Sequence, residues 1–517
     1  MKLRIPRTDL IALTSVIFIG YYFVNNAFAE DASTWVQKGE AALLAAQKLT
    51  PNNQQAKNVI LFVGDGMGIS TITAARIFEG QQNGIDGEGN QLAFEKLPYA
   101  ALSKTYSANQ QVPDSAPTMT AMVTGVKTNG RLISVSQAVS HYEPDANKIL
   151  AAKLTTILEQ SELKGLSTGI VSTARLTHAT PAATYAHTSN RGWESNDQLP
   201  EDTQVKDIAA QLIDNFGSGS VGDGIEVALG GGRTKFLPDT AVDPEYPSKN
   251  GERTDGRDLI KEYQQKFNAE YVWNKTQFDA IDTKSTQRLL GLFEPSHMKY
   301  EHDRTSGKER NEPSLSDMTS KAIDILAQNQ KGYFLMVEAA RVDHAHHAGN
   351  AYRAMSETVA LSDAVKTALA KVDLNETLVI VTADHSHTFT IVGYPARGNP
   401  ILGKVIAAGE SETTKAADGK PYTTLNYANG VGHHEDDGDG HALEEENVSL
   451  HPGRFVDLEN VDTMKPNYRQ EANMPRESET HAGEDVAIFA GGPKAHLFHG
   501  AHEQTHIYYV MKHALGL

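Results

Sequence analysis

Metal-binding residue types are concentrated in one short stretch of the chain. Residues 341–350, RVDHAHHAGN, contain one aspartate and three histidines, and Glu338 lies just upstream. If a helix begins near Ala340, Asp343 and His347 are four residues apart and therefore share a face. Mixed aspartate and histidine ligands suit zinc, whereas carboxylate, hydroxyl and water ligands suit magnesium. Taken alone, the stretch fits a metal site and a solvated histidine-rich loop equally.

Two other apolar runs also end in acidic residues. VGDGMG places Asp65 between glycines. A nucleotide-binding loop is excluded there, because Ile69 stands where G-x-G-x-x-G requires its last glycine. TADHSH places Asp384, His385 and His387 together. Acids from three strand ends would converge on one edge of a sheet. A pair of metal ions there, about 3.5–4 Å apart, would clamp the attacking and leaving oxygens of a displacement at phosphorus.

Such a displacement needs a nucleophile, and PDSAPTMTAMVTG at residues 113–125 offers one. Ser115 follows Asp114 and opens a helical run. The N-terminus of a helix favours both an oxygen of lowered pKa and a bound phosphate. The alternative for this pair of residues is an ordinary helix N-cap.

The strands that must position these side chains are indicated by continuous apolar runs, as in parallel strands buried on both faces. These apolar runs begin the segments 58–68, 332–347 and 378–387, and further strands are expected at 167–183 and 485–492. Helices are expected between them, at 314–329 and 353–372. This alternation predicts an α/β fold of three layers, doubly wound, with a mostly parallel central sheet and helices on both faces. Ligands in such folds bind beyond the C-terminal ends of the strands. Residues from about 394 to 475 show no long periodic element and are interpreted as an irregular insertion.

The charge balance and the N-terminus restrict partners and location. The 517 residues include 47 basic and 65 acidic side chains, a net charge of −18, which argues against nucleic acid or an anionic membrane as partner. Three basic residues, an apolar core and the small residues AFA, which end at Ala29, match an export signal. An uncleaved anchor is the alternative, although the apolar run is shorter than the ~20 residues of a membrane span. We therefore expect a signal peptide at 1–29, no stable membrane span after its removal, and a periplasmic or secreted domain at 30–517.

Six motifs occur in the order found in alkaline phosphatases: GDGMG, DSAPTMTAM, STARLTHATPAA, VEAARVDHAHHAG, TADHSHTFT and ETHAGEDVAIFAGGP. From about Asn58 to the C-terminus the chain resembles this family, and its animal-type branch in particular. The resemblance implies hydrolysis of phosphate monoesters to an alcohol and inorganic phosphate, through a phosphoserine intermediate on Ser115. It also implies a homodimer, in which the insertion forms a crown near the dimer interface.

The resemblance also implies two Zn²⁺ and one Mg²⁺, with ligands carried over residue by residue. One zinc would be bound by Asp343, His347 and His481, the second by Asp65, Asp384 and His385 with Ser115 beside it, and the magnesium by Asp65, Thr180 and Glu338. Arg191, in AHTSNRG, matches the arginine that clamps phosphate, and its planar fork suits two phosphoryl oxygens.

Further residues follow from the animal-type branch, which carries histidine at the positions of His178 and His344. His344 would contact phosphate through water and His178 would tune the magnesium site; the alternative is that both only make supporting hydrogen bonds. A Ca²⁺ site of that branch is also matched by Glu245, the Phe293 carbonyl, Glu294 and Glu312. The acidic stretch 435–446 resembles a calcium loop, but it lacks flanking helices and is interpreted as a solvated loop.

Three other functions account for fewer of these residues. A sulfatase requires arginine in [CS]-x-P-x-R, where this chain has Met119 after Ser115 and Pro117. Phosphodiesterases of this fold generally lack the magnesium position, which Thr180 and Glu338 would supply here. A zinc- or phosphate-binding protein without catalysis would need neither Ser115 nor an arginine clamp. A phosphomonoesterase remains the function that uses all of these residues.

Overall fold

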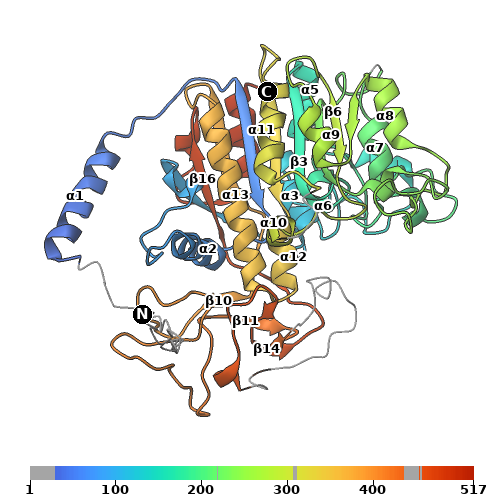
Figure 1. The fold of residues 1–517 in the computed structure, drawn as a ribbon. Coiled ribbons are helices and arrows are strands. Elements are labelled where there is room, and N and C mark those ends of the chain that lie inside the picture. Colours follow the sequence, from blue (N-terminus) through green and yellow to red (C-terminus); the bar gives the residue numbers. More distant parts are fainter. Residues whose placement is uncertain (1–29, 218, 307–310, 436–452, 454–456) are drawn as a thin grey trace, which may run out of the picture. The chain divides into compact units, whose positions relative to one another are not determined.

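The five expected apolar runs are strands of a ten-stranded central sheet in the computed structural model, which describes residues 30–217, 219–306, 311–435, 453 and 457–517 (Figure 1). The sheet belongs to the unit Pro51–Leu517, and its order is β17-β2-β16-β8-β1-β7-β3-β4-β6-β5. The strands are β1 (Asn58–Gly64), β2 (Tyr99–Lys104), β3 (Ser167–Arg175), β4 (Val227–Gly231), β5 (Glu270–Val272), β6 (Leu289–Leu292), β7 (Tyr333–Ala339), β8 (Thr377–Ala383), β16 (Val486–Gly491) and β17 (Ala501–Glu503). β16 pairs antiparallel with β8 and β2, and every other pairing is parallel. The predicted mostly parallel α/β sheet is confirmed.

Two apolar cores lie on opposite faces of this sheet, because successive side chains of a strand point to opposite sides. Val59, Leu61 and Val63 of β1 belong to one core, and Ile60 and Phe62 belong to the other. The first core is completed by α3 (Ser115–Thr124), α5 (Ile157–Lys164), α7 (Ile208–Asp214), α8 (Leu259–Phe267) and α14 (His506–Leu515). The second is completed by α2 (Ile69–Gln82), α11 (Leu315–Leu326) and α13 (Ala351–Lys371). Helices therefore cover both faces, as the sequence predicts.

Several expected elements are shorter than predicted. The strand expected at 167–183 ends at Arg175, and α6 (Ala179–Ala182) follows it. The helix expected at 314–329 is α11, which Ser314 caps by accepting the Asp317 N–H at 3.0 Å while the Asp317 carboxylate accepts the Ser314 N–H. Side-chain capping by Ser314 thus determines where α11 begins, which the spacing of apolar residues alone does not define.

The region expected as an irregular insertion contains short strands. β11 (Leu425–Gly430) and β14 (Ala472–Pro475) form a three-stranded sheet with β10 (Phe389–Ile391), which precedes the region, and β12 (His434–Glu435) pairs with β13 (Tyr468–Arg469). β9 (Ser386–His387) and β15 (His481–Ala482), which lie before and after the inserted region in the chain, pair antiparallel with each other. In Figure 1 the three-stranded sheet lies below α12 (Arg341–His347). All of the acidic stretch 435–446 except Glu435 lies outside the described residues.

The unit Met1–Thr50 contains one described helix, α1 (Ala32–Gln47), capped by the Asp31 carboxylate, which accepts the Thr34 N–H at 2.9 Å. None of the residues of α1 is buried. The predicted signal peptide, 1–29, lies outside the described residues. Among the helices that are described, none is both long enough and apolar enough to cross a membrane.

A buried ion pair beside α5 gives a test of the fold. Glu159 is fully buried and lies 2.7 Å from Lys153 Nζ and 3.1 Å from His187 Nε2. Burial raises the pKa of a carboxyl group, but the hydrogen bonds and charges of His187 and Lys153 outweigh burial and lower the pKa of Glu159 to about 2.

We expect Glu159→Gln to lower the free energy of unfolding at pH 7 by about 3 kcal/mol, the equivalent of that pKa shift. Because the pKa is lower in the folded than in the unfolded state, wild type keeps this advantage above the ordinary pKa of 4.5 and loses it as pH falls toward 2. Thermal unfolding of both proteins across this range checks the prediction, with the exposed Glu376→Gln as control. A gap in Tm that stayed constant down to pH 3 would contradict it.

Candidate metal centre and nucleophile

Three buried carboxylates meet where adjacent strands end. In the register of the sheet, the last residues of β1, β7 and β8 lie side by side. Asp65 follows β1, Asp384 follows β8, and Glu338 is next to last in β7. All three side chains are fully buried. The structure therefore brings the acids of the three predicted strands to one edge, as expected for an α/β sheet.

The helix α12 directly after β7 adds a group of histidines. Asp343 and His347 are one turn apart in it, with Asp343 Oδ1 3.4 Å from His347 Nε2. His481, in β15, places its Nε2 3.1 Å from His347 Nε2 and 3.3 Å from Asp343 Oδ1. Ligand atoms of these three residues and of His387 all lie within 4.8 Å of one another. Their spacing suits a single zinc ion.

The nucleophile candidate lies in a second group. Ser115 Oγ is 3.2 Å from His385 Nε2 and 3.4 Å from Asp65 Oδ1. The same imidazole nitrogen lies 3.3 Å from Asp65 Oδ1 and 3.3 Å from Asp384 Oδ2. One ring N–H cannot satisfy three oxygens, whereas a cation among them would contact all four groups. The residues assigned to the second zinc therefore fit a metal.

The magnesium position is indicated by unsatisfied oxygen atoms. Among the described residues, Asp65 Oδ2, Thr180 Oγ1 and Glu338 Oε1 are buried and have no hydrogen-bond partner. Ser172 Oγ donates to the other Glu338 oxygen at 2.5 Å. Buried polar atoms are normally paired, and two carboxylates with a hydroxyl are the oxygen donors that magnesium prefers. The residues present fit that ion.

Burial and mutual repulsion favour protonation of these acids unless cations neutralise them. Burial raises the pKa of Asp65 well above its usual range, and the charges of Asp384, Asp343 and Glu338 raise it further. Burial likewise raises the pKa of Glu338 to about 7, against the hydrogen bond from Ser172. Burial also lowers the pKa of His385 well below its usual value, so the ring is neutral and free to bind a metal.

Arg191 is held beside Ser115. Its NH1 donates to Asp114 Oδ1 at 3.0 Å, and its NH2 lies 3.0 Å from His178 Nε2. The Asp114 carboxylate also accepts the Ala116 N–H at 3.1 Å and so caps α3, whose first residue is Ser115. The guanidinium and the helix N-terminus consequently face the same space, which favours an anion such as phosphate.

His178 and His344 lie in a half-buried histidine cluster with a third member, His297, that the sequence did not indicate. The His178 and His344 rings are 5.6 Å apart, and His297 is 4.2 Å from His344 and 5.3 Å from His178. Arg175 NH1 lies 2.6 Å from His297 Nε2 and anchors it. His297 stands outside every histidine-rich motif, so no sequence signal pointed to it.

Two further residues support Asp343. His387 Nε2 lies 2.8 Å from Asp343 Oδ1, and His387 Nδ1 lies 2.5 Å from Glu479 Oε2. Although burial opposes it, the charges of Glu479 and Asp343 raise the pKa of His387 to about 10. The motif TADHSH pointed to His387, but the contact with Glu479 spans two distant segments.

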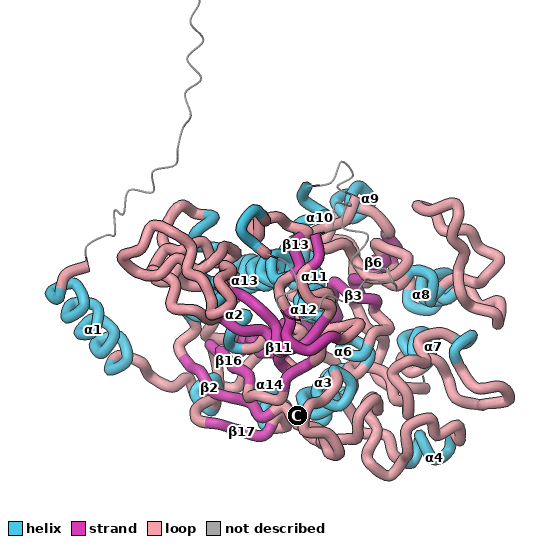
Figure 2. The backbone as a smooth tube through the Cα atoms, turned by 90° about the horizontal axis from the view of Figure 1, so that it is seen from below, coloured by secondary structure: helices cyan, strands magenta, loops and turns pink. Residues whose placement is uncertain are grey.

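His346, to which the sequence assigned no role, joins three elements. Its ring nitrogens lie 2.9 Å from Thr71 Oγ1 of α2 and 2.8 Å from the Tyr427 hydroxyl of β11. It is fully buried and packs on His387 with ring centroids 4.8 Å apart. His346 thus ties α12 to the inserted sheet; in Figure 2, α12 and β11 lie near one another.

The residues expected to bind calcium lie in one neighbourhood but already have partners. Glu294 Oε1 accepts the Tyr246 hydroxyl at 3.2 Å, and Glu312 Oε2 accepts the Lys299 N–H at 3.1 Å. Burial and the proximity of Glu294 raise the pKa of Glu312 well above its usual range. Glu245 lies 3.0 Å from Arg233 NH2 and is the least available of the three acids. Phe293, whose carbonyl was the fourth expected ligand, follows β6 directly and precedes Glu294 in the chain. Its side chain is buried.

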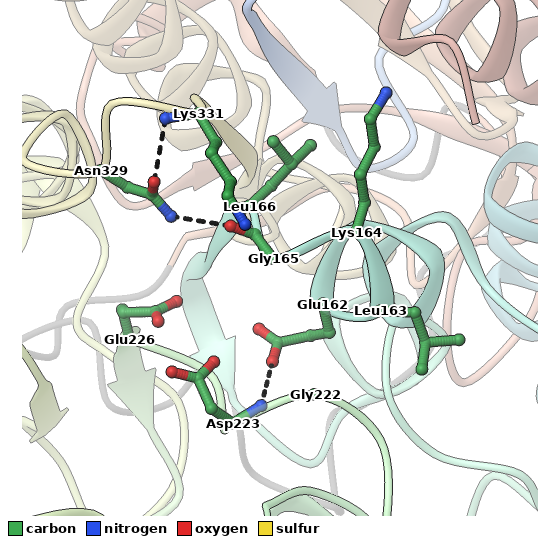
Figure 3. A pocket seen from close by; sticks show the side chains of 10 residues that line it. All are labelled: Glu162, Leu163, Lys164, Gly165, Leu166, Gly222, Asp223, Glu226, Asn329 and Lys331. Atoms are coloured by element: carbon green, nitrogen blue, oxygen red, sulfur yellow. Dashed lines mark hydrogen bonds between the residues drawn. The ribbon is translucent and has the colours of Figure 1, made fainter.

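Another acidic group lies at the opposite end of the sheet and is separate from this centre. Glu162, Asp223 and Glu226 line a pocket near the start of β3 together with Lys164 and Lys331 (Figure 3). Thr168 N–H donates to Glu226 Oε2 at 2.7 Å, and the Gly224 N–H donates to Glu162 at 3.1 Å. These carboxylates are bound by the protein itself.

We expect Glu479→Gln to weaken the binding of added zinc by about 10–100-fold, because loss of this charge leaves His387 less firmly oriented against Asp343, a candidate ligand. Competition with a chelator, read by metal analysis of the dialysed protein, measures the effect. The exposed neighbour Glu477→Gln is the matched control. Equal zinc retention by the two variants would show that the contact between His387 and Glu479 does not support the metal.

Comparison with known proteins adds independent information. A family model described as alkaline phosphatase matches residues 56–517. The tissue-nonspecific isozyme of alkaline phosphatase from Mus musculus is 43% identical over 513 residues, which cover 96% of this chain and 92% of that protein. The crystal structure of Thermus thermophilus alkaline phosphatase has a TM-score of 0.63 at 24% identity, covering 92% of this chain and 94% of that one. A mutant of the alkaline phosphatase TAB5 with Mg bound in the M3 site has a TM-score of 0.60 at 22% identity, covering 90% and 99%. At these identities, the two structures show a shared fold.

Proposed function

The chain belongs to the alkaline phosphatase family and hydrolyses phosphate monoesters, and from this premise we propose that it does so through a phosphoserine on Ser115, in a centre of two Zn²⁺ and one Mg²⁺. The observation that carries the proposal is the position of Ser115 Oγ. It lies 3.2 Å from His385 Nε2 and 3.4 Å from Asp65 Oδ1, at the N-terminus of α3.

Three sets of residues would hold the metals, as the donor types and the unsatisfied oxygens support. They are Asp343, His347 and His481 for one zinc, Asp65, Asp384 and His385 for the other, and Asp65, Thr180 and Glu338 for magnesium. When bound, the zinc ions supply Lewis-acid stabilisation of the attacking and leaving oxygens. The Mg named for the TAB5 mutant supports a magnesium ion in a protein of this fold.

The chain's own residues bind and orient the ester. The Arg191 fork and the positive N-terminal end of α3 bind the non-bridging phosphoryl oxygens and stabilise charge that develops on them. Asp114 keeps Arg191 in place through the 3.0 Å bond. Ser115 Oγ then forms the bond to phosphorus as the ester oxygen leaves as the alcohol.

In the second half-reaction water attacks the phosphoserine, the bond between Ser115 Oγ and phosphorus breaks, and inorganic phosphate leaves. His178 and His344 border this phosphate site, His178 through its 3.0 Å contact with Arg191. His344 lies 3.2 Å from Arg341 NH1, which orients its ring. We assign His344 to positioning phosphate through water. We assign His178, whose ring nitrogen lies within 4.8 Å of carboxylate oxygens of Asp65 and Glu338, to tuning the magnesium site.

Location, assembly and the calcium site complete the proposal. The N-terminal sequence supports export with cleavage after Ala29 to a periplasmic or secreted enzyme, and the net charge of −18 supports small-molecule substrates over nucleic acid. Family resemblance supports a homodimer. Proximity of Glu294 and Glu312 supports Ca²⁺ at the fourth site, with Glu245 and the Phe293 carbonyl as further ligands once Arg233 releases Glu245.

Removing the nucleophile tests the mechanism. We expect Ser115→Ala to reduce phosphate release from an aryl monoester at alkaline pH by about 10³-fold or more, as for other nucleophile replacements. Ser356→Ala, whose hydroxyl bonds only within α13, is the control and should retain full turnover.

Chelation provides the second arm of the test. Wild-type turnover should disappear on removal of the metals and return when zinc and magnesium are added back. Brief acid quenching during turnover should trap labelled phosphate on wild type and none on Ser115→Ala. Turnover by Ser115→Ala close to that of wild type would exclude a phosphoserine on this residue.

A further inference from the structure

Backbone strain is concentrated in the segment 131–142, next to the phosphate clamp. Among the residues that the structure describes, seven other than glycine have a positive φ, and three of them lie here: Arg131 at 67°, Ser134 at 44° and Tyr142 at 65°. Such conformations cost roughly 1–3 kcal/mol each and persist where the surroundings impose them, often at functional sites. The positive φ values in this segment therefore need a structural explanation.

Asp114 and Arg191, which flank Ser115, hold the main chain of Arg131. The Arg131 N–H donates to Asp114 Oδ2 at 2.9 Å, and the Arg191 N–H donates to the Arg131 carbonyl at 2.9 Å. A bridge between Ile133 and Thr188 continues this pairing away from the site. Arg131 is thus locked at a fixed place beside the clamp, in a conformation that glycine or asparagine would adopt more easily.

Solvent exposure increases from Ser115 through Arg191 to Arg131. Ser115 is 2% exposed, the Arg191 side chain is 19% exposed, and Arg131 is exposed. A phosphoryl group bound between Ser115 and Arg191 must direct the rest of its ester toward solvent. Arg131 is exposed and its main chain contacts both Asp114 and Arg191, so we place it on the solvent side of the clamp, toward which the leaving group points.

The side chain of Arg131 is free to bind a ligand. Within the described part of the chain, its guanidinium makes no hydrogen bond or ion pair, although acidic residues outnumber basic ones. Neighbouring arginines are engaged: Arg191 with Asp114, and Arg175 with Glu194. An unpaired guanidinium fork suits a carboxylate or a second phosphate group.

We propose that Arg131 is a specificity-determining residue, which binds a second anionic group on the leaving-group side of the phosphate monoester. The inference rests on the proposed function and narrows its substrate class. Esters whose alcohol carries a carboxylate or phosphate are preferred to neutral esters of equal reactivity. The fixed backbone serves this recognition by holding the Arg131 main chain next to Asp114 and Arg191.

A matched pair of substrates tests it: para-carboxyphenyl phosphate and para-carbamoylphenyl phosphate, which differ in charge while keeping similar shape. Wild type should prefer the carboxylate by about fivefold in kcat/KM, the size of an exposed ion pair, mainly through KM. In about 0.5 M salt the preference should shrink, because the charges are screened within a few Å. Arg131→Gln, which keeps a long polar side chain on the same backbone, should bring the ratio to about 1. Arg131→Lys should retain part of the preference.

Turnover of the neutral carbamoyl substrate distinguishes failure of the inference about Arg131 from failure of the proposed mechanism. This substrate should be turned over equally by wild type and Arg131→Gln, whereas Ser115→Ala should turn over neither substrate. Loss of both substrates in Arg131→Gln would overturn the inference and assign Arg131 to holding the clamp. An unchanged ratio in Arg131→Gln, or no preference in wild type, would also overturn it. Full turnover of both substrates by Ser115→Ala would instead contradict the proposed mechanism.

Discussion

Repulsion among buried carboxylates is the constraint on which the rest of this structure depends. The register of β1, β7 and β8 brings Asp65, Glu338 and Asp384 to one edge, fully buried. Their charges cannot persist together in a medium of low polarity unless cations or protons neutralise them. Metal ions bound there would satisfy the carboxylates and leave the edge able to attract a phosphate ester. The sheet register is therefore part of the chemistry, since a shift of one residue in a strand would turn its acid away.

Residues that are distant in sequence contact the side chains at this edge of the sheet and hold them in place. The pairing of β9 with β15 places His481 opposite His387, and Glu479 binds the outer nitrogen of His387. His346 links α12 to α2 and β11 through one imidazole ring. These contacts orient the histidines before any metal arrives, which reduces the reorganisation that binding requires.

Much of the fold and of the candidate site was predictable because parallel strands have a strong local signature. Apolar runs that end at Glu338 or are followed at once by Asp65 or Asp384 predict both the strands and the edge at which they end, and the predicted fold class and phosphatase activity are confirmed. Positions that depend on long-range contacts were not predictable. His297 meets His344 only through tertiary packing, and no local pattern links Glu479 with His387. The strand at 167–183 was overestimated because its apolar pattern continues into α6.

The pairing of β15 with β9 has a consequence for biosynthesis. Asp65 emerges early and His481 near the end of translation, so no partial chain contains the complete set of ligands. Central strands that are distant in sequence must also find one another before the edge exists, and such non-local topologies fold slowly. A chain threaded unfolded through a membrane would therefore cross without an assembled centre. Catalytic competence would begin only after nearly the whole polypeptide has been released and folded on the far side.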